Sequence, residues 1–426
     1  MSRPHDGQWP FFPFGKPLRM ILPKGSYIPP KLKSLLNAFE ETLADRFRKL
    51  KPKDESEVVS LSWMRRAMES LSETHNDVKS LITDLQFPVS DWDSQWMDMY
   101  LDNSVKLLDI CIAFSSEISR LDQGQLLLQY ALHVIDPSGE FPSEEQLKKA
   151  DISLIDWMQR FKSRSPKIEN SCLNLEELAR SLCFPKSKNS SKGKVLMQAM
   201  YGVKVQTIFV CSVFSAAFTS SSRPLMNLQV PEKFLWATLF NDLQGYVNGE
   251  IRRRISSGRP IILRELEAVS YCSEKLHDLT SGGTTQFGAN SLQKENGIDH
   301  KEDRSSQIVN EGKEKVERLQ VLVTELGEAA EKAAGGLDLL SKGVGDFFQI
   351  VLSGRDALLC NLRVSDVMQE NDNRHRFSLE VATTVGGPPE NPSTEHCQPI
   401  IRIHYIRQPW AVILSIICCK RGVQSL

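Results

Sequence analysis

Several features that would indicate an enzyme are missing from this 426-residue sequence. Its nine cysteines form no C-x-x-C pair and no Cys/His group with zinc-finger spacing, which favours free thiols in a reducing compartment. The sequence has no Walker loop, no G-x-G-x-x-G motif and no G-x-S-x-G elbow. We therefore predict a protein that is not an enzyme and that has no cofactor, no metal site and no catalytic residues.

Strong net charge is also missing, because 52 basic and 53 acidic residues leave a formal charge of -1. Such a balance gives no general attraction to nucleic acid. Acidic residues are, however, excluded from two long stretches, Gly7 to Phe39 and Leu178 to Pro231. Basic and apolar residues without acids suit an anionic membrane surface. The residues predicted to contact it are Trp9, Phe11, Phe12, Phe14, Lys186, Lys188, Lys192, Lys194, Lys204, Ile208, Phe209 and Phe214.

The apolar run at 207–218 is shorter than the roughly 20 residues that span a bilayer. Three interpretations stay open for it: a helix buried in a protein core, a helix lying at the membrane interface, and a single membrane span. The lysines before it would place its N-terminal side in the cytosol if it spans.

The alternation of apolar and polar residues that is typical of β-strands is also scarce. Apolar residues recur instead at helical spacings. We predict an all-α fold, an elongated bundle of long amphipathic helices with a heptad-patterned C-terminal helix. The expected divisions are a Pro- and aromatic-rich basic arm (1–30), a bundle (31–279, linker about 185–193), a disordered insertion (280–312), a long heptad helix completing the bundle (313–363) and a disordered tail (364–426).

The heptad segment is the most regular part of the chain. Its apolar residues alternate spacings of three and four over about five heptads, as in a coiled-coil seam. The seam would pack inside the bundle or bind a partner helix, and both alternatives stay open here. The candidate partner-seam residues are Leu319, Val323, Leu326, Leu337 and Leu340.

Glu274 and His277 have the E-x-x-H spacing of di-iron bundles. Such a site needs a second copy of the motif and two further glutamates, which the sequence does not offer. His75 and His133 each lie among apolar neighbours in a predicted helix. We interpret these histidines as structural.

Several segments resemble the BYPASS family of plant developmental regulators and its wider ROH-type group. They include 13–17 (PFGKP), 36–45 (LNAFEETLAD), 73–77 (ETHND), 88–92 (PVSDW), 126–133 (LLLQYALH) and 354–363 (GRDALLCNLR). The resemblance covers roughly residues 9–366, and the chain departs from it after about Val364. It implies a helical protein that restrains a mobile root-derived signal related to carotenoids.

The function predicted from this resemblance is a non-enzymatic regulator of root and shoot development that acts through protein or membrane contacts. One alternative is an adaptor that binds an exocyst subunit, or another helical protein, in vesicle tethering. A second alternative is an enzyme acting on a carotenoid-derived small molecule. We expect a cytoplasmic location, with membrane association as a single-pass or peripheral protein as the alternative. A plastid location is disfavoured, because the Pro- and Phe-rich start is unlike a transit peptide.

Overall fold

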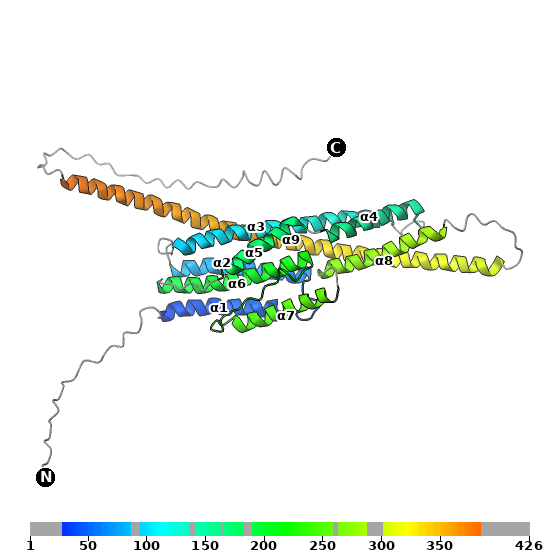
Figure 1. Ribbon diagram of the computed structural model, residues 1–426, viewed down its shortest axis with the longest axis horizontal. Coiled ribbons are helices and arrows are strands. Elements are labelled where there is room, and N and C mark those ends of the chain that lie inside the picture. The colour runs from blue at the N-terminus through cyan, green and yellow to red at the C-terminus, as the bar shows by residue number, and fades with distance from the viewer. Residues whose placement is uncertain are drawn as a thin grey trace, which may run out of the picture. The chain divides into compact units, whose positions relative to one another are not determined.

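A computed structural model describes residues 28–86, 94–135, 142–163, 165–182, 190–258, 263–287 and 301–384. Every regular element in these ranges is an α-helix, which confirms the predicted all-α class (Figure 1). The chain divides into two compact units, Met1–Asp366 and Val367–Leu426. The first unit holds the bundle. The predicted arm at 1–30 lies almost entirely outside the described residues.

Helices α1 (Pro30–Leu50) and α2 (Leu61–Leu85) open the bundle. Pro30 starts α1, where its missing N–H costs nothing, and the helix buries one stripe that includes Leu36, Leu43 and Phe47. Ser60 caps α2 by accepting a hydrogen bond from the Trp63 backbone N–H. The predicted helical stripes in this part of the chain are therefore present.

Helix α3 (Ser94–Val134) continues through Gly124 without a break. The Trp157 ring of α4 (Glu144–Lys162) packs against this glycine, where an added Cβ would lie 3.3 Å from the ring. Gly124 therefore serves a close approach instead of ending the helix. A capping box between Ser143 and Gln146 starts α4. Helix α5 (Pro166–Arg180) follows it.

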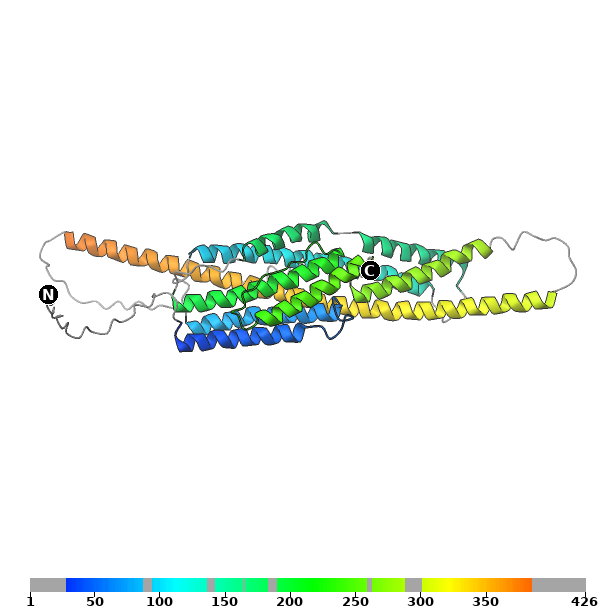
Figure 2. The same ribbon diagram turned by 60° about the horizontal axis from the view of Figure 1, so that its bottom comes forward.

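Helix α6 (Ser191–Thr219) lies in the middle of the bundle (Figure 2). It packs against α1, α2 and α5. Helix α7 (Ala237–Ser256) packs against α1 and meets α6 through the Phe209–Phe240 ring contact. Gly202 allows the close approach to α1, because a Cβ there would lie 2.7 Å from Leu43 Cδ2. Of the predicted linker at 185–193, only its last residues are described, and they begin α6.

Helices α8 (Arg264–Phe287) and α9 (Lys301–Thr384) correct two predicted boundaries. The predicted disordered insertion at 280–312 is helical up to Phe287 and from Lys301, and 288–300 lie outside the described residues. The predicted disordered tail is likewise helical over 364–384, and 385–426 lie outside the described residues. An established helix extends with one hydrogen bond per added residue and does not need an apolar stripe. The prediction relied on that stripe alone.

The heptad helix α9 packs along α2 and α3 within the same chain. Gly336 lies against Leu61 of α2 and Gly343 lies against Met68, so these two helices run parallel with matching heptads. Arg355 reaches the Leu101 carbonyl of α3, while Gly327 faces Leu132, so α3 runs antiparallel to α9.

The seam thus packs within the chain, and a partner helix could reach it only if α9 left the bundle. Its five candidate residues, Leu319, Val323, Leu326, Leu337 and Leu340, are all buried inside the bundle.

Candidate functional site

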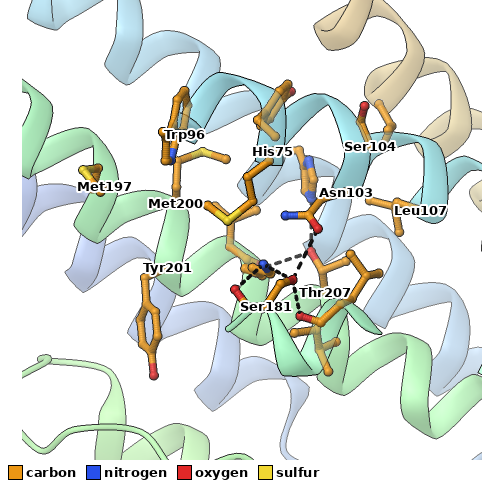
Figure 3. Close-up of a pocket in the computed structure, with 17 residues that line it drawn as sticks. His75, Trp96, Asn103, Ser104, Leu107, Ser181, Met197, Met200, Tyr201 and Thr207 are labelled. Carbon is orange, nitrogen blue, oxygen red and sulfur yellow. Dashed lines mark hydrogen bonds between the residues drawn. The ribbon is translucent and has the colours of Figure 1, made fainter. Parts of the chain in front are cut away.

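A half-enclosed cavity of about 100 Å³ lies where α2, α3, α5, α6 and α9 meet (Figure 3). We call it the central cavity. Much of its wall is apolar or aromatic, and in the view of Figure 3 Met197 and Tyr201 lie on one side and Ser104 and Leu107 on the other. Of the described residues that line it, none carries a carboxylate. Its polar groups are those of His75, Trp96, Asn103, Ser104, Ser181, Lys204, Thr207 and two tyrosines.

Lys204 of α6 forms the charged part of the wall. Its Nζ donates hydrogen bonds to the Ser181 carbonyl oxygen at 2.8 Å and to the Ser181 hydroxyl at 2.7 Å. Ser181 is the C-cap residue of α5, so the ammonium group lies at the negative end of that helix. The Ser181 hydroxyl also lies 3.3 Å from Asn103 Oδ1 of α3. Three helices thus meet in one polar group at the edge of the cavity.

His75 of α2 forms a second polar position, and it is neutral. The Thr207 hydroxyl donates to the Val203 carbonyl at 2.8 Å, so it accepts its 3.2 Å bond from His75 Nε2–H. The Phe347 ring packs edge-on against the imidazole at 5.0 Å. Burial among these groups lowers the histidine pKa from 6.5 to about 4, because desolvation disfavours the charged form. The imidazole therefore adds no positive charge near neutral pH.

Arg355 of α9 holds the α3 wall in place. Its Nη1 donates to the Leu101 carbonyl at 2.6 Å and to the Ser104 hydroxyl at 3.0 Å. The preceding Gly354 leaves room for Tyr100, because an added Cβ would lie 3.2 Å from the tyrosine oxygen. Burial raises the pKa of Tyr100, and the nearby Arg355 charge lowers it by less. Gly354 and Arg355 belong to a segment that carries the family resemblance, as His75 does.

The predicted membrane residues divide into three groups. Trp9, Phe11, Phe12, Phe14, Lys186 and Lys188 lie outside the described residues. Lys192 donates to the Gln86 carbonyl at 3.0 Å, Lys194 is half-buried at the start of α6, and Lys204 lines the cavity. Ile208, Phe209 and Phe214 are fully buried in the bundle.

The burial of α6 supports the first of the three interpretations of the acid-free stretch, a helix buried in a protein core. This helix is long and apolar enough to cross a bilayer, but 89% of its apolar window is buried within the chain. A carboxylate on a helix surrounded by core side chains would need a buried partner, which is costly to supply. Burial in the core thus accounts for the missing acids over the α6 part of the stretch, and Ile208, Phe209 and Phe214 would reach lipid only if α6 left the bundle.

The E-x-x-H histidine has a structural partner. His277 Nδ1 lies 2.5 Å from Asp151 Oδ1 of α4, and the Thr280 hydroxyl donates to the same oxygen at 2.9 Å. The described residues contain no group of three or more metal-binding side chains. This contact joins α8 to α4.

Sequence reasoning missed the central cavity because its residues come from five helices that are far apart in the chain. Trp96 and Tyr100 stack at 5.8 Å between ring centroids, but in the sequence they are only two aromatic residues at helical spacing. Asn103, Ser181 and Arg355 have no motif of their own. The available signal was one lysine inside an apolar, acid-free helix, which is unusual for a core helix.

The fold and the cavity define the class of this protein as an all-helical bundle with an internal cavity. Among proteins of known sequence, the chain is similar to UPF0496 protein 4 of Oryza sativa subsp. indica, with 42% identity over 86% of this chain and 98% of the relative. It is 46% identical to Protein BPS1, chloroplastic, of Arabidopsis thaliana, over 85% of this chain and 93% of the relative. Protein ROH1D of Arabidopsis thaliana is 19% identical over 76% of this chain and 87% of the relative.

The chain belongs to the BYPASS family, and the family model described as Protein ROH1-like matches residues 30–174. This membership confirms the resemblance and supports a role in the regulation of plant development. None of these names denotes an enzyme. The word chloroplastic in one of them weighs against the expectation that a plastid location is disfavoured. No solved structure matches the chain.

Proposed function

We propose that this protein is a non-enzymatic regulator of root and shoot development that restrains production of a mobile root-derived signal by binding other molecules. The observation that supports binding is the lining of the central cavity. It combines aromatic and sulfur-containing walls with a few converging polar groups, which is the usual composition of a ligand site.

The enzyme alternative gains no support from this geometry. General acid–base catalysis needs a group that titrates near the working pH. The histidine of the described lining has a pKa of about 4 and hydrogen-bonds Thr207, and no carboxylate lies among the lining residues. A carotenoid-derived molecule would be bound at such a site without an evident base to act on it.

The exocyst-adaptor alternative loses the surface that was assigned to it. The seam of α9 that was predicted to hold a partner helix faces α2 and α3 instead. An adaptor would have to use the outer faces of the bundle, where Val321 and Leu339 of α9 are each 55% exposed.

Reciprocal grafting between plants with and without this protein tests the proposed function. A normal shoot on a root that lacks the protein should develop abnormally, because the unrestrained signal moves upward. A shoot that lacks the protein should develop normally on a normal root. Defects that follow the genotype of the shoot instead of the root would contradict the proposal.

A further inference from the structure

The outer face of α3 carries a heptad pattern of its own. Four apolar residues on this face are each between 41% and 66% exposed: Val105, Ile112, Leu126 and Tyr130. Together with the polar residues between them, the exposed and half-buried positions of the face alternate spacings of three and four over 102–133. The buried seam of α9 has the same spacing and is covered by other helices. An exposed face of this kind is typical of an interaction surface.

The pattern on α3 is symmetric about its centre. Ile112 and Leu126 lie seven residues before and after Ser119, and serine also occupies positions 115 and 116. A second α3 laid antiparallel across Ser119 would therefore place Ile112 of each copy against Leu126 of the other. A surface that pairs with itself in this way forms a closed dimer with two-fold symmetry.

Helices α5 and α4 follow one another along α3 and run antiparallel to it (Figure 1). Lys106 Nζ of α3 lies 2.9 Å from Glu177 Oε2 of α5, and Arg120 of α3 donates to the Arg160 carbonyl of α4. Lys106 and Arg120 are two heptads apart, so α5 and α4 pack on the same side of α3. In the antiparallel dimer, α5 of one copy would therefore face α4 of the other.

The exposed residues of α5 and α4 are complementary in this arrangement. Three exposed residues of α5 come in the order apolar, acidic, basic: Leu173, Glu176 and Arg180. Three exposed residues of α4, taken in the opposite direction with the same spacings, come in the order apolar, basic, acidic: Ile152, Lys149 and Glu145. When Ile112 faces Leu126, each member of the first set lies level with the matching member of the second. This match favours a second copy of the chain as the partner.

The area of the face is sufficient for a stable dimer. At a rise of 1.5 Å per residue, the stripe over 105–133 is about 40 Å long, and with α4 and α5 it is two helices wide. It therefore covers on the order of 800 Å² per copy, which is the size of a standard interface.

We propose that the outer face of α3, together with α4 and α5, binds the same face of a second copy in an antiparallel dimer with two-fold symmetry. The inference goes beyond the proposed function, because the contact between the two copies involves no residue of the central cavity.

Sedimentation of the full-length chain over a series of concentrations tests the proposal. The chain should sediment as a dimer and dissociate on dilution. An interface of standard size holds at micromolar concentrations, so a chain that remains monomeric at about 100 μM would overturn the proposal. The α3 face would then belong to a different partner.

Substitution of two exposed leucines locates the contact. Leu126→Glu should raise the dissociation constant of the dimer about a hundredfold, because a carboxylate would lie against Ile112 at two symmetric places. Leu339→Glu is the matched control, because Leu339 is 55% exposed and lies on α9, outside this face. It should leave the dissociation constant unchanged. A dimer that withstands Leu126→Glu would contradict the proposal.

Charge reversal tests the register of the two copies. Glu176→Lys and Lys149→Glu should each raise the dissociation constant about tenfold, because each places like charges opposite one another twice. The double variant should regain most of the lost affinity, since the exchanged charges face each other again. A double variant that binds no more tightly than either single variant would overturn the antiparallel arrangement. All these positions are exposed in the single chain, so far-UV circular dichroism should show unchanged helix content.

Discussion

Replacing Gly336 with alanine should push α2 and α9 apart. The new Cβ would lie 2.7 Å from Leu61 Cδ1 and 3.0 Å from Leu61 Cβ. Because Cβ atoms are fixed to the backbone, this overlap cannot be relieved by rotating a side chain alone. Overpacking of this kind costs about 1–3 kcal/mol, and the better helix propensity of alanine returns about 1 kcal/mol. We expect a net loss of up to about 2 kcal/mol in the free energy of unfolding.

The neighbouring Gly335 provides a matched control. A Cβ at this position meets no atom within 4 Å, so Gly335→Ala should gain about 1 kcal/mol from propensity alone. The two substitutions are chemically identical and adjacent in one helix. Their difference of about 1–3 kcal/mol therefore isolates the packing of α9 on α2.

Urea unfolding followed by far-UV circular dichroism measures this difference as a shift in midpoint at constant slope. Gly336→Ala should have the lower midpoint and Gly335→Ala a midpoint above that of the unaltered protein. Equal midpoints for the two variants would refute the reasoning. The seam would then not lie against α2, and a partner-helix role for it would return.

Three further predictions follow from the cavity and from α6. The free energy of unfolding should fall as pH falls from 6.5 to about 4, by up to about 1.4 kcal/mol per pH unit, because His75 takes up a proton in the unfolded chain but not in the folded one. In urea unfolding, His75→Gln should show a weaker dependence of this free energy on pH over the same range. Arg355→Met removes two hydrogen bonds between α9 and α3 and should cost about 1–3 kcal/mol, and an unchanged urea midpoint would argue against this contact. Cys111 is buried next to Phe114, whose ring lies 5.6 Å from the Phe214 ring of α6. A maleimide should therefore label the exposed Cys360 and leave Cys111 unlabelled, both without and with anionic vesicles. Labelling of Cys111 with vesicles would show that α6 leaves the bundle.

Local patterns explain which parts of the fold were predictable. Some features depend only on residues within a few turns of one helix. They are the apolar stripe of α1, the capping box at Ser143 and the heptads of α9. The role of Gly124 could not be read locally, because it depends on Trp157, which lies on another helix. The turns of α8 and α9 that lie within the predicted disordered segments were missed, because no apolar stripe in their sequence indicates a helix.

The candidate site was predictable only in fragments. The sequence alone identified the family and the all-helical class, and it placed Lys204 only among the residues predicted to contact a membrane. It could not decide whether that lysine and the apolar side chains after it face lipid or protein, because both surroundings exclude acids.

The tertiary structure decided this question by surrounding α6 with α1, α2 and α5, which buries Phe209 and places Lys204 at the C-terminal end of α5. The orientation of the α9 seam was decided in the same way. A heptad pattern specifies that a helix needs a partner, whereas only packing specifies which helix that partner is.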